Sequence, residues 1–471
     1  MNVVESFLET AQQEGNRTAI IAGDSDRIGF AELARGSGRL AASWQRQGIV
    51  RGDRVLVAMP VGVALYTAIA ALWRLGAVVV FPEPAMGLAG IRPAVEIATP
   101  RATVLGGIYR ILPLLVPALL GVRLRLAMDF SHGGDPVEDV EPDAPALISF
   151  TSGSTGRPKA IVRSHGFLAA QNDELAPLLA PTRPDETDLV AFPVFVVANL
   201  ALGVTSVLPN WRLSRADTAE AGQIAEHVGR HKVTRLLVQP SLAEIIAGGG
   251  TSLPVHTLFT GGGPVFPDLL ERLTTRLPRT DIVSIYGSTE AEPIAHQVLA
   301  DISADQWAAM KSGAGLLAGR PSTGTQLRII DDEIVVTGQH VNQGYLGGIG
   351  DAENKVCIDG QVWHRTGDAG RMDANGFVWL RGRLSARSGT IYPFEAEIAA
   401  RSWPGVRRAA LVPGTVPMLA IEGSEPAGGL WQRHAETIGI GRVMPMRIPL
   451  DRRHRSKVDY VALRRRLSAG Q

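Results

Sequence analysis

The stretch Ile148-Ser149-Phe150-Thr151-Ser152-Gly153-Ser154-Thr155-Gly156-Arg157-Pro158-Lys159 decides how this sequence is interpreted. An apolar segment of strand length leads into a loop rich in hydroxyl groups and glycines, which ends on a lysine. Glycines let a backbone approach a ligand closely, and N–H groups, hydroxyl groups and lysine all bind phosphate oxygens. The stretch is not a P-loop, because it lacks Gly-Lys-Ser/Thr and carries Pro158 instead of a helical donor. It predicts a polyphosphate-binding loop; the alternative is a linker-like Ser/Gly turn.

Apolar runs of strand length alternate with helix-length patterns around this loop. The runs are Arg54–Met59, Ala77–Phe81, Ala146–Phe150, Leu189–Phe192, Arg235–Val238, His256–Phe259 and Asp281–Ile285. This alternation is typical of an α/β domain with largely parallel sheets. From about Gln326 the strand signals become shorter and are separated by turns such as Asn375-Gly376, which predicts a β-rich subdomain. The predicted fold class is α/β: a large N-terminal body of several subdomains, followed by a small α+β C-terminal lid domain.

A basic cluster, Arg381-Gly382-Arg383, follows the last of the body's strand signals. The segment after it has helices and short strands of its own. We therefore expect a hinge near residues 382–387, a nucleotide-binding body at 1–382 and a mobile C-terminal lid at 383–471.

Composition excludes several classes of protein. The chain has 471 residues, and 47 Lys and Arg against 46 Asp and Glu leave a net charge of +1. This balance argues against nucleic acid as a partner. Cys357 is the single cysteine, so one chain cannot build a disulfide framework, a Cys-rich zinc site or an iron–sulfur cluster. With no signal peptide expected, the protein is predicted to be cytoplasmic. Residues 55–73 are uncharged, but Pro60 and Gly62 divide them into a strand and a helix, so no integral membrane segment is expected.

The loop resembles the phosphate loop of the AMP-forming adenylating superfamily, which includes acyl- and aryl-CoA synthetases, nonribosomal-peptide adenylation domains and firefly luciferase. Further segments resemble that family's signatures, in the family's order and over nearly the whole chain. They are Gly261-Gly262-Gly263-Pro264, Tyr286-Gly287-Ser288-Thr289-Glu290, Thr366-Gly367-Asp368, Arg383 and Arg455-Ser456-Lys457-Val458-Asp459.

The resemblance implies a nucleotide-binding set and a catalytic set. The nucleotide-binding set is Thr151, Ser152, Gly153, Ser154, Thr155, Gly156 and Lys159 for the phosphates, Gly261, Gly262, Gly263, Tyr286, Gly287 and Ser288 beside the adenine, and Asp368 and Arg383 for the ribose. In the catalytic set, Thr289 contacts the α-phosphate, Glu290 coordinates Mg²⁺ and Lys457 stabilises the transition state of adenylation. Cations such as Mg²⁺ and the Lys457 ammonium group are needed because attack of a carboxylate on the α-phosphorus brings an anion to a polyanion, and the cations neutralise the charge that builds up.

The implied activity is ATP- and Mg²⁺-dependent activation of a small carboxylic acid as an acyl adenylate, with release of pyrophosphate. Acyl transfer to a thiol, of CoA or a carrier protein, is the expected second step. The loop at 384–390 is shorter than in CoA ligases, which speaks against CoA, and residues 288–293 and 449–457 are similar to the olefin β-lactone synthetase branch. Three alternatives stay open: capture of the adenylate by the acid's own 3-hydroxyl group, transfer to an amine, and a non-catalytic nucleotide-binding regulator.

The segment Phe195-Val196-Val197-Ala198-Asn199 is expected to line the substrate pocket. Phe195 and Val196 would make its entrance apolar, and Asn199 would either bond a substrate hydroxyl group or cap a helix. The segment lacks the aspartate that holds the amino group in amino-acid adenylating domains. The sequence therefore favours a fatty, 3-hydroxy or aromatic acid, and it does not specify the acid, the acceptor, the oligomeric state or the pathway.

Overall fold

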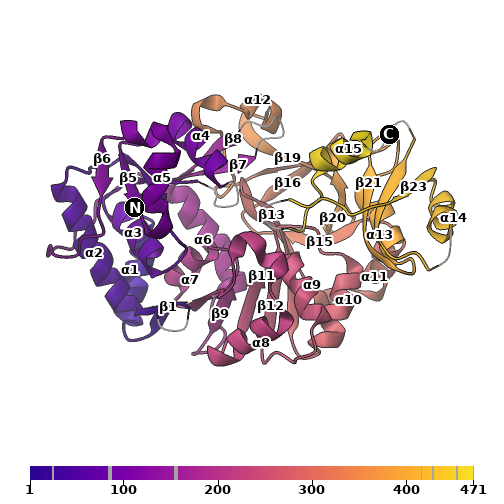
Figure 1. The fold of residues 1–471 in the computed structure, drawn as a ribbon, viewed down its shortest axis with the longest axis horizontal. Helices are drawn as coiled ribbons and strands as arrows, with labels where there is room; N and C mark the ends of the chain where they lie inside the picture. Colours follow the sequence, from indigo (N-terminus) through magenta and orange to yellow (C-terminus); the bar gives the residue numbers. More distant parts are fainter. Residues whose placement is uncertain are drawn as a thin grey trace.

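The computed structural model describes residues 1–23, 26–82, 87–152, 158–414, 416–426, 429–451 and 455–469. These residues form a six-stranded sheet, a fourteen-stranded sheet and a three-stranded sheet, with helices on their faces. The first two sheets build the body, and the small sheet lies with the C-terminal helices at the other end of the molecule (Figure 1).

The six-stranded sheet has the order β6-β5-β3-β4-β7-β8 and is parallel except for β8. Its strands are β3 (Arg54–Ala58), β4 (Val78–Phe81), β5 (Ala102–Leu105), β6 (Leu124–Leu126), β7 (Pro145–Ser152) and β8 (Pro158–Ser164). Its first helices are α2 (Phe30–Arg46), α3 (Val63–Arg74) and α4 (Leu88–Ala98). Val55 and Val57 pack in one core with α3, whereas Leu56 and Ala58 pack in another with α4. Burial on both faces explains why β3 is a continuous apolar run.

The fourteen-stranded sheet combines a parallel half and an antiparallel half. The parallel half comprises β1 (Thr18–Ala22), β10 (Thr205–Leu208), β9 (Thr187–Val190), β11 (Arg235–Val238), β12 (Thr257–Gly261) and β13 (Asp281–Ser288), with β2 (Asp26–Gly29) antiparallel at its edge. Its helices are α1 (Val4–Gln13), α6 (His165–Leu179), α7 (Phe195–Leu202), α8 (Ala221–Arg230), α9 (Pro240–Gly248) and α10 (Pro267–Arg276).

The antiparallel half begins at β14 (Ala291–Val298), earlier than the sequence indicated. It continues through β15 (Leu316–Pro321), β20 (Val378–Arg383), β19 (Gln361–Met372), β17 (Glu333–Thr337) and β16 (Gln326–Ile330), with β18 (Lys355–Ile358) beside β19 and α11 (Ala304–Lys311) before β15. The predicted β-rich region is thus an extension of the body's own sheet. The α/β fold class is confirmed.

The C-terminal region has its own sheet and its own cores. Its elements are α13 (Pro393–Arg401), β21 (Val406–Val412), β22 (Met418–Gly423), α14 (Leu430–Thr437), β23 (Arg442–Pro445) and α15 (Tyr460–Ala469). Leu411 and Trp431 belong to the core that includes α13 and α14, whereas Val412 and Leu463 belong to the core under α15. The sheet is therefore covered on both faces, as expected for a small C-terminal domain. The boundary between 382 and 383 stays a prediction.

An ion-pair cluster joins α13 to the body. The guanidinium of Arg401 donates to Asp268 at 2.7 Å and to Glu244 at 3.2 Å, and it lies 4.4 Å from the ring centre of Phe266. The Arg401 side chain is only 7% exposed. A charge at this depth is stabilised by its partners rather than by water.

Residues 55–73 divide into β3 and α3, as predicted. Within the described ranges, every helix is too short or too polar to cross a lipid bilayer.

The C-terminal domain is expected to lose stability as the pH rises from about 5 to 8. Glu397 in α13 is buried, and its carboxyl group accepts hydrogen bonds from the Leu411 N–H at 3.1 Å and the Tyr460 hydroxyl at 3.3 Å. Burial raises the pKa of Glu397 to about 7. The folded state thus keeps a proton that the unfolded chain releases near pH 4.5, and the stabilisation is complete below that pH and is lost through pH 7. The loss amounts to about 3 kcal/mol, at about 1.4 kcal/mol per pH unit.

Urea unfolding at pH 5 and pH 8 tests this expectation when native chain and Glu397→Gln are compared. The glutamine side chain carries no titratable proton. The unfolding free energy of the variant should therefore fall between pH 5 and pH 8 by about 3 kcal/mol less than that of the native chain. Parallel pH profiles of the two proteins would contradict the assignment to Glu397.

Candidate active site

The candidate site lies at the carboxyl ends of β11, β12 and β13, three neighbouring parallel strands. Ligands of doubly wound sheets bind at such ends. Gln239 Oε1, Thr260 Oγ1 and Ser288 Oγ are buried there without a hydrogen-bond partner among the described residues. Because buried polar atoms are nearly always paired, three such atoms at the ends of neighbouring strands indicate a site that receives a polar ligand.

The glycine run Gly261–Gly263 ends β12 and borders this site. A Cβ atom on Gly261 would come within 2.5 Å of the Ile285 carbonyl oxygen, so only glycine lets the two strands approach this closely. A Cβ atom on Gly263 would come within 2.6 Å of the Ser456 Cβ atom. The loop is therefore in tight contact with the C-terminal domain.

Three predicted ribose- and adenine-side residues meet in one cluster. The Tyr286 hydroxyl donates to Asp368 Oδ2 at 3.0 Å, and Arg383 Nε lies 3.3 Å from Asp368 Oδ1. Asp368 and Arg383 face each other in the register of β19 and β20, and Arg383 also donates to the Thr366 carbonyl at 2.7 Å. Burial and the nearby Asp368 carboxylate raise the pKa of Tyr286 well above its usual value, so its hydroxyl stays a donor. Gly287 and Ser288 follow Tyr286 at the end of β13.

Glu290 lies between β13 and β14, next to Tyr345. The Tyr345 hydroxyl donates to Glu290 Oε1 at 2.9 Å, and the Asn342 N–H donates to the Glu290 carbonyl at 2.7 Å. Burial pushes the pKa of the Glu290 carboxyl group up, but His364, the Tyr345 hydroxyl and Lys355 outweigh burial and hold it below its usual value. Glu290 is therefore a carboxylate at neutral pH.

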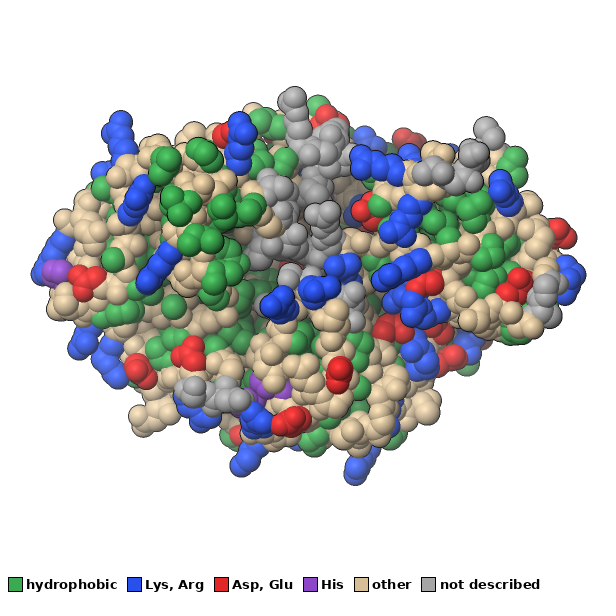
Figure 2. Space-filling model, viewed as in Figure 1, with side chains coloured by type: hydrophobic (Ala, Val, Ile, Leu, Met, Phe, Trp, Pro, Cys, Tyr) green, Lys and Arg blue, Asp and Glu red, His purple; other side chains and the backbone are tan. Residues whose placement is uncertain are grey.

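Two lysines flank Tyr345, and Lys355 was not singled out from the sequence. The ammonium groups of Lys159 and Lys355 lie 5.4 Å and 5.3 Å from the centre of its ring. Lys355 donates to the Asn342 carbonyl, and burial lowers its pKa to about 8 although Glu290 and Asp351 act in the opposite direction. Two cations and one carboxylate thus surround a single tyrosine. Lys and Arg side chains also gather near the middle of the face shown in Figure 2.

Tyr345, Lys355 and His364 are the site residues that sequence reasoning missed. Lys355 pairs with His364 across the hairpin of β18 and β19, whose turn is Asp359-Gly360. That turn can be recognised in the sequence. Counting outward from it along both strands would have paired Lys355 with His364, two residues before the motif that begins at Thr366.

The phosphate loop is only partly described. Thr151 and Ser152 end β7, and Thr151 pairs with Lys159 of β8 in the antiparallel ladder. The predicted contacts Gly153, Ser154, Thr155 and Gly156 lie outside the described residues. Thr289 is held through its carbonyl, which accepts from Arg163 Nη2 at 2.6 Å.

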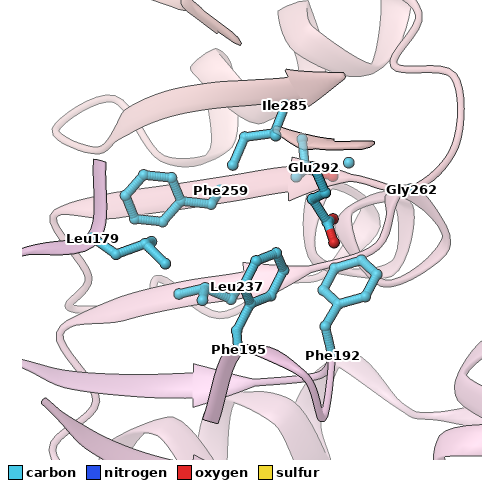
Figure 3. A pocket seen from close by; sticks show the side chains of 10 residues that line it. Leu179, Phe192, Phe195, Leu237, Phe259, Gly262, Ile285 and Glu292 are labelled. Atoms are coloured by element: carbon cyan, nitrogen blue, oxygen red, sulfur yellow. The ribbon is translucent and has the colours of Figure 1, made fainter. Parts of the chain in front are cut away.

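A narrow cavity opens beside the glycine run (Figure 3). Apolar side chains from α6, α7, β11, β12 and β13 form its wall. The residues that line it are Leu179, Phe192, Phe195, Leu237, Phe259, Thr260, Gly261, Gly262, Ile285 and Glu292. The rings of Phe192 and Phe195 pack edge to face at 5.7 Å.

Of the predicted pocket residues, only Phe195 is among those that line this cavity. Val196 is fully buried in the body's core. The Asn199 amide donates to Asp188 at 3.1 Å and to Ser206 at 3.1 Å, and Asp188 forms a buried ion pair with Arg235. Asn199 therefore supports buried charges instead of facing the cavity.

The C-terminal motif reaches the site from the other domain. Ser456 Oγ accepts a hydrogen bond from the Ser241 N–H at the start of α9, at 3.1 Å. Asp451 accepts from the backbone N–H groups of Ser456 and Lys457 at 3.0 Å and 2.9 Å, which fixes the turn that carries Lys457. Ser456, the residue before Lys457, thus lies beside the glycine run.

The described residues contain no cluster of three His, Cys, Asp or Glu side chains that could cage a metal ion. Mg²⁺ in nucleotide sites does not need a cage, because one or two carboxylates together with phosphates and water complete its shell. The ionised Glu290 carboxylate, next to the Tyr345 ring and its two lysines, can be such a carboxylate.

Comparison with known proteins agrees with this geometry. The family described as AMP-binding enzyme matches residues 7–346. An olefin beta-lactone synthetase of Xanthomonas campestris is 29% identical over 92% of this chain and 89% of its own length. A feruloyl-CoA synthase of an Amycolatopsis species is 30% identical over 85% of this chain and 83% of its own length. The structure of the o-succinylbenzoate CoA synthetase of Bacillus subtilis in complex with an acyl-adenylate intermediate has the same fold, with a TM-score of 0.79 and 21% identity over 97% of each chain.

Proposed function

Because this chain belongs to the AMP-binding enzyme family, we propose that it activates a carboxylic acid with ATP and then passes the acyl group to a thiol. The observation that carries the proposal is the meeting of the Tyr286, Asp368 and Arg383 cluster, the Glu290 carboxylate and the Lys457 turn around one set of strand ends. A decayed, purely regulatory fold would have no reason to hold these opposing charges together.

In this proposal the nucleoside binds through the first cluster. Asp368 accepts hydrogen bonds from the ribose hydroxyl groups, and Arg383 keeps that carboxylate oriented. The Tyr286 ring stacks on the adenine, next to the Gly261–Gly263 run.

The phosphates bind on the side of Lys159, Lys355 and Glu290. Mg²⁺, held by the Glu290 carboxylate, neutralises phosphate charge when it is bound. Lys159 and Lys355 provide two further positive charges near the Tyr345 ring, and Tyr345 orients Glu290 through its hydroxyl group.

The reaction itself is a substitution at the α-phosphorus. A carboxylate oxygen of the acid forms a bond to this phosphorus, the bond to the bridging oxygen of the β-phosphate breaks, and pyrophosphate leaves with the electron pair. Negative charge builds on the α-phosphate oxygens, and the Lys457 ammonium group is the cation that stabilises it. Contact between Ser456 and the body keeps water away from the labile adenylate.

The acceptor is the part of the proposal with two candidates. A thiol, of CoA or of a carrier protein, is the more frequent acyl acceptor in the family. The short segment after β20 favours capture by a 3-hydroxyl group, because Ser388 and Ile391 already bridge each other and Arg387 donates to the Tyr392 hydroxyl at 3.1 Å, which leaves little chain to line a thiol channel. The similarity to an olefin beta-lactone synthetase over 92% of the chain points the same way.

The experiment that tests the function is pyrophosphate release with ATP and Mg²⁺ over fatty, 3-hydroxy and aromatic acids, with and without CoA, with the products identified by mass. Release that depends on an acid supports adenylation. CoA-dependent thioester formation supports the thiol acceptor, and a lactone without CoA supports the alternative. Nucleotide binding without release for any acid would favour the regulator.

Closure of the C-terminal domain can be tested at Gly263. Gly263→Ala is expected to slow pyrophosphate release by about tenfold to a hundredfold, because its Cβ would overlap Ser456 only in the closed arrangement and such overpacking costs ~1–3 kcal/mol. The loss of rate should exceed any loss of ATP affinity. The matched control is Gly222→Ala, since nothing lies within 4 Å of a Cβ atom at that position in α8. An unchanged rate for Gly263→Ala would contradict the role given to this contact.

A further inference from the structure

One stretch of the body carries apolar side chains that face inward and others that face outward. Residues 107–121 form three consecutive short turns, which are η2 (Gly107–Ile111), α5 (Leu112–Leu115) and η3 (Pro117–Gly121). The inward-facing set is buried in the core shared with α4 and comprises Leu112, Val116 and Leu119. The outward-facing set, called the apolar patch below, comprises Ile108, Ile111, Leu114, Leu115 and Leu120.

The apolar patch is strongly exposed. Leu114 is 83% and Ile108 77% exposed, and the other three side chains are more than half exposed. No other stretch of this length within the described ranges gathers as many exposed large apolar side chains. Figure 2 shows apolar side chains, with Lys and Arg side chains among them, over the region of α4 and α5 that Figure 1 labels. Exposed apolar clusters of this kind mark surfaces that bind a protein or a membrane.

The charges in this part of the sequence are all positive. Between Ala102 and Met128 no acidic residue occurs, and the charged residues are Arg110, Arg123 and Arg125. All three arginines are exposed, and no ion pair joins them to a carboxylate among the described residues. The whole chain has a net charge of only +1, so the positive charge beside the patch is a local excess.

The two elements beside the patch preserve this charge pattern. The helix α4 packs against η3 and begins with the exposed Leu88. Its Glu96 carboxylate is neutralised by Arg92, whose Nε lies 2.7 Å from it. The strand β6, which carries Arg125, is an edge strand of the six-stranded sheet. Charged side chains on an edge strand oppose the addition of a further strand.

The charges and the protruding side chains favour a lipid surface as the partner. A second copy of this chain, docked through a twofold axis, would bring the same three arginines against each other, and like charges weaken an interface. A folded protein would need a pocket for each protruding side chain. A lipid layer surrounds such side chains without matching their shape, and its anionic headgroups attract arginines.

We propose that the apolar patch and its three arginines dock this protein on the surface of a membrane that contains anionic lipids. Leu114 and Ile108, the most exposed members, enter the boundary between headgroups and acyl chains. The guanidinium groups bind lipid phosphates, for which their fork of donors is suited. This surface holds none of the residues assigned to the nucleotide or the acid, so the inference is independent of the proposed adenylation.

Flotation with lipid vesicles tests the proposal. The native chain should bind vesicles made of phosphatidylcholine and phosphatidylglycerol in a two-to-one mixture, and bind pure phosphatidylcholine vesicles about tenfold more weakly or less. Added salt should weaken binding to the mixture, because it screens the charges.

Two sets of substitutions separate the apolar and the charged contributions. Ile108→Ser combined with Leu114→Ser should lower the affinity for the mixed vesicles by about tenfold or more, because these side chains no longer leave water. Arg110→Gln, Arg123→Gln and Arg125→Gln combined should lower it by about a hundredfold, at about fivefold for each arginine, and remove most of the salt dependence. Both variants should keep the thermal midpoint of the native chain, because the replaced side chains are exposed.

Matched controls remove similar side chains elsewhere. Met372→Ser with Val461→Ser replaces two exposed apolar residues, and Arg464→Gln with Arg465→Gln replaces two exposed arginines of α15. Each control should change the affinity for vesicles by about twofold at most. Binding that is lost in the α15 control and kept in the patch variants would move the membrane contact to α15 and overturn the proposal.

The other partners are outcomes of the same experiment. Equal binding to mixed and pure vesicles, or binding to neither, would overturn the proposal. Without vesicle binding, self-association of the native chain that Ile108→Ser with Leu114→Ser abolishes in sedimentation equilibrium would assign the patch to a second copy. A monomer that binds no vesicles would leave a partner protein as the occupant. Pyrophosphate release is not a readout here, so failure of this inference leaves the proposed function untouched.

Discussion

Replacement of Lys457 by alanine is expected to lower the rate of pyrophosphate release by about 10²–10³-fold while the Kd for ATP changes little. The reason lies in where the cation acts. Lys457 sits on a turn fixed by Asp451, and its neighbour Ser456 contacts the body beside the glycine run. In the proposed reaction the ammonium group meets the α-phosphate where charge builds in the transition state, so it should contribute little to the binding of ATP in the ground state.

Single-turnover pyrophosphate release and equilibrium binding of ATP separate these two effects. Lys311→Ala is the matched control, because Lys311 is an exposed lysine of α11 that pairs with Glu271 away from the site. Equal loss of rate in both variants, or a loss of ATP affinity as large as the loss of rate in Lys457→Ala, would argue against a role in the transition state.

Replacement of Glu290 by glutamine is expected to lower the rate by about 10²-fold and to raise the Mg²⁺ concentration needed for half-maximal rate. The substitution preserves shape, and the amide carbonyl can still accept the Tyr345 hydroxyl bond that Glu290 accepts at 2.9 Å. What is lost is the negative charge, which the depressed pKa of Glu290 shows to be present at neutral pH. Without it, the positive charges of Lys355 and Lys159 repel a divalent cation with one carboxylate fewer to offset them.

Titration of the rate with Mg²⁺ at saturating ATP is the measurement. Glu353→Gln is the control, because Glu353 is an exposed carboxylate on the neighbouring α12 (Asp351–Asn354). An unchanged Mg²⁺ requirement in Glu290→Gln would remove Glu290 from the metal site and would leave the nucleotide cluster untouched.

The sequence was sufficient for the α/β class and for the parallel strands, because the signals involved are local, but it did not show that the β-rich region continues the body's own sheet. The continuous apolar run of β3 requires burial on both faces, and the split of residues 55–73 follows from Pro60 and Gly62. The family motifs likewise placed Tyr286, Asp368 and Arg383 in one set, and the structure brings them into hydrogen-bonding and ion-pairing contact.

What the sequence did not reveal depends on contacts between distant segments. Asn199 looked like a pocket residue, but its orientation is decided by Asp188 and Ser206 on two neighbouring strands. Nothing in the local sequence singles out Lys355, because only the packing of its hairpin against Tyr345 buries it. Glu292 follows the metal-site motif as an ordinary acidic residue, and only the turn from β13 to β14 directs it into the cavity.

The buried ion-pair cluster around Arg401 stabilises the arrangement of the C-terminal domain against the body that the structure shows. Any rotation near residues 382–387 must withdraw Arg401 from Asp268, Glu244 and the Phe266 ring, and all of these charges must then be hydrated again. If the C-terminal region rotates as proposed, breaking this cluster opposes the rotation, although the cluster lies away from the residues assigned to the reaction. Such a cluster can keep the C-terminal domain over the adenylate until the reaction is complete, without contacting either substrate. Substitutions in the cluster would then change how long the adenylate is covered and leave the chemical step unchanged.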